Sequence, residues 1–224
     1  MASPTLAATH TGAADGATTT SHTVNLPASI SAGDLLIVLV GWEKVPGTVT
    51  MTDWSSLAAD DNAVYLQLFY KTASGSEGST VSVTTVESIR ASFVAGRITG
   101  WSGTPEKGTA ATGTSATPDG PSLSPSGGSQ DYLWISAWAY NRGDATSPTE
   151  PTNYSSTVVN GGGSAGGRPT VAAAFRALTA SSEDPGAWSG LSTPANSWVA
   201  QTFAISPVPP VAALKAYSYR RRWV

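Results

Sequence analysis

The residues that could carry acid–base chemistry are few. The chain holds two histidines, His10 and His22, and both precede the first strong strand pattern, so a Ser-His-Asp arrangement would depend on an N-terminal arm. Adjacent carboxylates occur at Asp60–Asp61 and Glu183–Asp184, whereas a glycosidase needs two acids that converge across a cleft. Neighbouring side chains on a strand or turn point apart. The sequence therefore predicts a protein that is not an enzyme.

Metal and cofactor sites have equally weak support. Asp60, Asp61 and Asn62 could offer oxygens to Ca²⁺, but they lack the spacing of an EF-hand, and a solvated turn is the favoured interpretation. GGGSAGG (161–167) lacks the Lys-Ser/Thr ending of a phosphate-binding loop and precedes no credible helix, so it indicates a hairpin tip. With no cysteine in the chain, thiolate metal sites and disulfides are excluded. We expect no metal and no cofactor.

The stretch QDYLWISAWAYN (130–141) is the sharpest candidate for a binding surface. On a β-strand its side chains alternate, which places Leu133 and Ile135 on one face and an aromatic ladder on the other. Exposed, the ladder would suit stacking on sugar rings, as in a lectin-like module for host or surface attachment. Eight tryptophans are more than a chain would display, so burial or subunit contact is favoured. The ladder consists of Tyr132, Trp134, Trp138 and Tyr140.

The C-terminal segment 209–224 carries a different signal. PVPP (207–210) ends the last strand pattern, and aromatic residues then interleave with a run of arginines. A solubilising disordered end is one interpretation; an anchoring tail is favoured, because aromatic and arginine side chains dominate protein interfaces and an acidic partner would attract the arginines. The predicted partner-binding residues are Tyr217, Tyr219, Arg220, Arg221, Arg222 and Trp223.

The elements that would position these residues are strands. Segments with period-2 alternation and β-branched or aromatic residues recur between Gly, Pro, Ser and Asp, at the spacing of a sandwich or jelly roll. We expect an all-β fold, a two-sheet antiparallel jelly-roll-like β-sandwich with long Gly/Ser/Thr-rich loops. VAAAFRALTA (171–180) could also be a helix, but the alternation of Val171, Ala173 and Phe175 favours a strand. The nine expected strands are 22–26, 34–42, 48–54, 63–71, 80–85, 89–101, 131–141, 168–178 and 197–208.

Composition narrows the classes of partner. Charged residues make up 12% of the 224 residues, against about 25% in an average soluble domain. The net charge is −3 and residues 1–219 hold nine basic and fifteen acidic residues, which does not favour nucleic acid as a partner. No segment has the pattern of a signal peptide or of a membrane span, so we expect neither export by a signal nor membrane insertion.

Domain organisation follows from the loops. Residues 102–130 are depleted in large apolar groups and are expected to form a crossover loop, while GDLLIVLVGWE (33–43) echoes QDYLWISAWAYN. The echo fits tandem domains or two halves of one sandwich. Because the run from Leu35 to Val40 is apolar on both faces, it needs cover from both sides, which favours one domain over residues 22–208. Residues 1–21 are then an N-terminal arm or first edge strand.

The order of these segments resembles a known group of proteins. The resemblance lies in LPASISAGDLLIVLVGW, VYLQLFYKTASGSEGSTVSVT, FVAGRITGWSG and the closing DPGAWSG and SWVAQTFAISPV. Through these segments the chain resembles jelly-roll proteins encoded among the structural genes of tailed bacteriophages. These are head decoration, head-fibre or tail-associated proteins. The resemblance implies a non-enzymatic structural component of a virion, assembled in the host cytoplasm and released by lysis. Its expected partners are other virion proteins and further copies of this chain, with host-surface glycans as the alternative.

Overall fold

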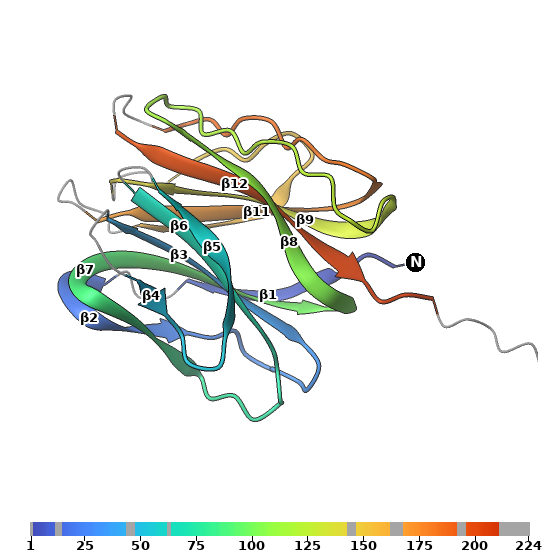
Figure 1. Cartoon of the computed structure of the whole chain (residues 1–224), viewed down its shortest axis with the longest axis horizontal. Coiled ribbons are helices and arrows are strands. Elements are labelled where there is room, and N and C mark those ends of the chain that lie inside the picture. The colour runs from blue at the N-terminus through green and yellow to red at the C-terminus, as the bar shows by residue number, and fades with distance from the viewer. Residues whose placement is uncertain are drawn as a thin grey trace, which may run out of the picture.

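The computed structural model describes residues 2–11, 15–43, 48–61, 64–142, 147–161, 168–191 and 196–210. Within these ranges the protein is all-β and forms a sandwich of two antiparallel sheets (Figure 1). The strands are β1 (Thr5–Thr11), β2 (Asp15–Asn25), β3 (Leu35–Glu43), β4 (Val49–Thr50), β5 (Ser55–Asp61), β6 (Val64–Thr72), β7 (Thr80–Thr99), β8 (Trp101–Gly113), β9 (Gln130–Tyr140), β10 (Ser155–Gly161), β11 (Thr170–Ala180) and β12 (Trp198–Pro207).

Each sheet is built from one half of the chain. Sheet A runs β1-β7-β3-β6-β5, with β2 and β4 also paired to β7, and sheet B runs β10-β11-β9-β12-β8. The chain passes from β7 to β8 at Gly100, whose φ of 71° lies in the left-handed region that glycine adopts most easily. The similar segments 33–43 and 130–141 contain the central strands of the two sheets. β3 lies between β7 and β6, and β9 lies between β11 and β12.

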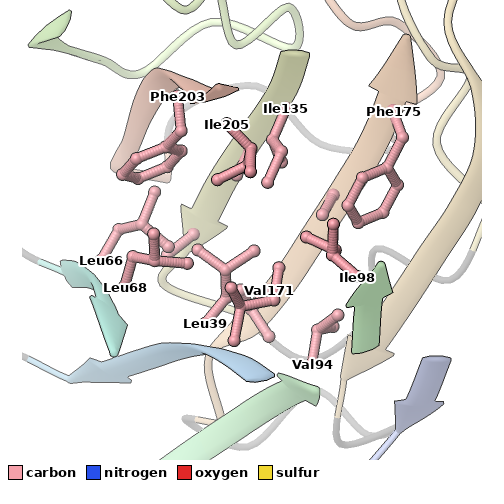
Figure 2. Close-up of a cluster of buried hydrophobic side chains, with 14 of the residues drawn as sticks. Leu39, Leu66, Leu68, Val94, Ile98, Ile135, Val171, Phe175, Phe203 and Ile205 are labelled. Carbon is pink, nitrogen blue, oxygen red and sulfur yellow. The ribbon is translucent and has the colours of Figure 1, made fainter. Parts of the chain in front are cut away.

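A shared apolar core joins the two sheets (Figure 2). Alternate side chains of β3, including Leu35, Ile37 and Leu39, meet Ile135 of β9 and Phe203 of β12, together with neighbours from both halves. Burial of each large aliphatic or aromatic side chain stabilises the fold by about 1.5–3 kcal/mol. Both halves of the chain contribute to this one cluster.

The outer face of sheet A is covered by the chain itself. β7 is 20 residues long and curved; its C-terminal part lies between β1 and β3, while its N-terminal part pairs with β2 and β4 (Figure 1). Val24 of β2 and Val83 of β7 thereby join Val38 and Val40 of β3 in a second buried cluster. The run from Leu35 to Val40 is fully buried, which confirms that both of its faces are covered.

Two expectations for the strands need correction. Residues 102–130 are not a loop throughout, because β8 occupies Trp101–Gly113 and pairs with β12. This segment lacks large side chains because an edge strand can be held by main-chain pairing alone. Residues 80–85 and 89–101 form the single strand β7 up to Thr99 instead of two strands, and in segment 48–54 only Val49–Thr50 is a strand. The strand prediction for residues 171–180 is confirmed by β11.

Candidate functional site

The aromatic ladder of β9 is buried. Tyr132, Trp134 and Trp138 have no exposed surface and Tyr140 is 1% exposed, so no ring offers a face to solvent. They belong to a third apolar cluster on the outer face of sheet B, which also includes Tyr154, Trp188, Leu191 and Trp198. The favoured interpretation, burial of the ladder, is therefore the one the structure supports. Of the other tryptophans in the described residues, Trp42 is also buried, while Trp54 and Trp101 are partly exposed.

Three of these rings satisfy their polar edges inside the protein, whereas the buried indole N–H of Trp138 has no hydrogen-bond partner among the described residues. Tyr132 donates its hydroxyl proton to the carbonyl of Gly128 at 3.1 Å, and Trp134 donates its indole N–H to the carbonyl of Leu178 at 3.1 Å. Trp198 likewise donates to the carbonyl of Ser115 at 3.1 Å. A sugar-binding ring keeps its edge and one face free for the ligand. Hydrogen bonds of this kind, to the protein's own main chain, are those of interior aromatic residues.

The cover over the ladder is made of the protein's own loops. The backbones of Leu123 and Glu183 exchange two hydrogen bonds, at 2.9 and 3.0 Å, which join the loop after β8 to the loop after β11. Trp188, in the second of these loops, donates its indole N–H to the hydroxyl of Ser136 on β9 at 2.9 Å. Both loops lie over sheet B (Figure 1). A glycan could reach the ladder only after these loops had moved, so the ladder is a poor candidate for a sugar platform.

A charged network lies beneath this cover. Arg176 of β11 and Glu183 form an ion pair of 2.7 Å, and Tyr154 donates its hydroxyl proton to the same carboxylate oxygen at 3.3 Å. The Glu183 side chain is 7% exposed. Burial and the negative charge of Glu183 both raise the pKa of Tyr154. The tyrosine therefore stays protonated at neutral pH, and the network holds the loop after β11 to the sheet.

The two carboxylates of Glu183–Asp184 point in different directions. Glu183 turns inward to Arg176, whereas Asp184 is exposed and acts on Asp119, whose pKa is raised by burial and by the charge of Asp184. This agrees with the expectation that neighbouring acids diverge. The side chains of Asp60 and Asp61, and all of Asn62, fall outside the described residues. Among the residues that are described, no three His, Asp or Glu side chains gather as metal ligands.

The two histidines lie on different strands. His10 of β1 is exposed and its Nδ1 lies 2.9 Å from the carbonyl oxygen of Thr11. His22 of β2 is fully buried, with its ring centroid 5.6 Å from that of Phe93. The strands that hold them, β1 and β2, are both paired to β7.

An open cleft of about 240 Å³ lies along one edge of the sandwich. Pro4 and the first two residues of β1, Thr5 and Leu6, line one side, and Phe175 and Arg176 of β11 line the other. Thr5 pairs with Thr99, immediately before the crossing between sheets. We call this the edge cleft.

A second cleft, of about 190 Å³, lies on the outer side of sheet A. It is lined by Trp54, Lys71 and Glu77 among others, and we call it the Trp54 cleft. No sequence pattern points to these residues, because they come from separate segments and no spacing links them. The only local signal was a tryptophan in a polar turn, TDWSS (52–56).

The predicted tail residues Tyr217, Tyr219, Arg220, Arg221, Arg222 and Trp223 lie outside the described residues, as do Gly162 to Gly167 of the glycine-rich tip. None of the described residues forms a helix with the length and hydrophobicity to cross a membrane. Comparison with protein-family models, with curated proteins and with solved structures gives no match to this chain.

Proposed function

We propose that the protein is a non-enzymatic structural component of a bacteriophage particle, a surface decoration, fibre or tail-associated protein that acts through protein–protein contacts. The resemblance of its strand order to such proteins motivates the class. The two-sheet antiparallel sandwich that the resemblance implies is present, with each half of the chain in one sheet. Membership of the jelly-roll group is a finer part of the proposal.

The observation that carries the proposal is the position of Val208, which directly follows β12. Val208, just after β12, donates its backbone N–H to the carbonyl of Gly100 at 3.3 Å. A Cβ built on Gly100 would lie 3.9 Å from the Cα of Pro4, which lines the edge cleft. Val208 therefore lies at the same end of the sandwich as an open, partly apolar cleft.

Charge supports the same contact. Three of the twelve basic residues are Arg220 to Arg222, while residues 1–219 carry nine basic and fifteen acidic residues. A basic, aromatic tail attached to an acidic body favours contact between the tail of one molecule and the body of its neighbour. Further copies of this chain and other particle proteins are the proposed partners, with assembly in the host cytoplasm and release by lysis.

The test compares the full chain with a chain that ends at Pro210. Sedimentation equilibrium over a range of concentrations should show association of the full chain, weaker at high salt, and a monomer for the truncated chain. A matched control of full length replaces Arg220, Arg221 and Arg222 with Gln and should associate more weakly than the natural chain. Binding of the full and the truncated chain to purified particles tests the proposed contact with other particle proteins. A truncated chain that associates and joins particles as well as the full chain would refute the anchoring tail.

A further inference from the structure

The Trp54 cleft is formed where four segments meet. Trp54 follows the short strand β4, Lys71 lies near the end of β6, Glu77 is in the turn between β6 and β7, and Thr80 begins β7. Leu26, which is 6% exposed and belongs to the second apolar cluster, also lines the cleft. The volume of about 190 Å³ is below that of sites for drug-sized ligands and suits one small ring.

The rim of the cleft is held in shape by Glu77. Its carboxylate accepts hydrogen bonds from the backbone N–H of Ser74 at 2.7 Å, from the Ser74 hydroxyl at 2.9 Å and from the Gly75 N–H at 2.9 Å. Gly75 has a φ of 86°, and a Cβ there would lie 3.0 Å from the Ala32 nitrogen. The turn is therefore held in one conformation without a ligand. Both carboxylate oxygens of Glu77 accept hydrogen bonds from residues of this turn.

Lys71 keeps donors for a ligand. Its ammonium group lies 3.8 Å from the nearer oxygen of Glu77, beyond a good hydrogen bond, and its side chain is 30% exposed. Because Glu77 offsets its charge, the cleft is close to neutral and gives little net attraction to an anion. The exposed hydroxyls of Thr52 and Thr80 add groups that both donate and accept.

The remaining wall is aromatic. Trp54 is partly buried against the second apolar cluster, so its ring is supported on one side while it lines the cleft. An indole face beside one ammonium and two hydroxyls matches a ligand with an apolar face and a rim of hydroxyl groups. We propose that the Trp54 cleft binds one neutral pyranose unit of a glycan, with the ring against Trp54 and its hydroxyls bonded to Lys71, Thr52 and Thr80.

The experiment follows the tryptophan indole and backbone N–H resonances of the full-length ¹⁵N-labelled protein. The probes are methyl glucoside, methyl galactoside, methyl mannoside and methyl N-acetylglucosaminide, up to about 50 mM, well above a Kd on the order of 1 mM. The Trp54→Phe spectrum assigns the Trp54 indole signal. At least one sugar should shift that signal together with Gly78 and Thr80, in a saturable way.

Variants and charged probes make the result decisive. Trp54→Ala should abolish the saturable shifts while the rest of the spectrum stays dispersed, and Lys71→Gln should weaken binding about tenfold. The matched controls Trp101→Phe and Lys107→Gln, on β8 in the other sheet, should leave the affinity unchanged. The proposal is overturned if no sugar shifts the Trp54 signal, if the shifts persist in Trp54→Ala, or if sulfate or methyl glucuronide binds the cleft more tightly than every neutral sugar.

Discussion

Trp188 donates its indole N–H to the hydroxyl of Ser136 at 2.9 Å, and both groups are buried. The two residues lie 52 positions apart, one in a loop and the other in the central strand of sheet B. This bond ties the cover to the aromatic face that it closes. Removal of either partner leaves the other group buried without its hydrogen bond.

We therefore expect Trp188→Phe and Ser136→Ala each to lower the free energy of unfolding by about 1–3 kcal/mol. Trp188→Ala should cost about 3–5 kcal/mol, because it also leaves a cavity beside Trp138. Urea unfolding followed by near-ultraviolet circular dichroism measures both effects. The double variant Trp188→Phe/Ser136→Ala should cost less than the sum of the single changes. Strict additivity would show that the bond contributes little.

The close approach of the two sheets at Gly41 predicts a second effect. A Cβ on Gly41 of β3 would lie 3.1 Å from the Cβ of Ala139 and 3.3 Å from that of Val171, both held by central strands of sheet B. Gly41→Ala should therefore destabilise the protein by about 1 kcal/mol or more, despite the entropy that alanine removes from the unfolded chain. Gly78→Ala is the matched control, because its nearest atom is 4.0 Å away. An equal urea midpoint for both variants would contradict this packing.

The acid response of the turn at Glu77 provides a third prediction. Burial raises the pKa of Glu77, but hydrogen bonds from Ser74 and Gly75 outweigh it and lower the pKa to about 2 from 4.5. A depressed pKa means that the carboxylate stabilises the fold above pH 4.5, and that this stability is lost as the pH falls toward 2.

Glu77→Gln should accordingly lower the free energy of unfolding at pH 7 by about 1 kcal/mol, the difference between charged and neutral acceptors. The gap between variant and natural protein should narrow below about pH 4.5 and close near pH 2. Urea midpoints measured at intervals from pH 7 to pH 2 check this. If the difference in unfolding free energy stays constant over that range, the charge of Glu77 does not stabilise the fold.

The ion pair between Arg176 and Glu183 is the basis of a fourth prediction. Glu183→Gln leaves the Arg176 guanidinium without its counterion at a side chain that is 24% exposed, so the cost should be about 2 kcal/mol, below that of a fully buried pair. The control is Glu43→Gln, which removes the partner of Arg90 at 3.9 Å, in a pair exposed by 35% and 28%. That change should cost less than about 1 kcal/mol. Equal effects in thermal unfolding would argue against the network beneath the loops.

The sequence by itself determined the class of fold and the double cover of its central strands. Alternation of side chains is a property of neighbouring residues, so β3, β9 and β11 are evident from the pattern alone. The apolar run of Leu35 to Val40 likewise requires burial on both faces, wherever the cover comes from.

Only the tertiary structure decided what covers each face and which clefts stay open. β8 and β5 have small or polar sequences and become strands because a neighbour offers main-chain partners, which no local pattern records. Trp188 reaches Ser136 from 52 residues away, and Trp54 and Lys71 line one cleft from separate segments of the chain. These contacts depend on how two sheets and their loops pack together, since long-range packing, and not local alternation, sets the distance between residues far apart in the chain.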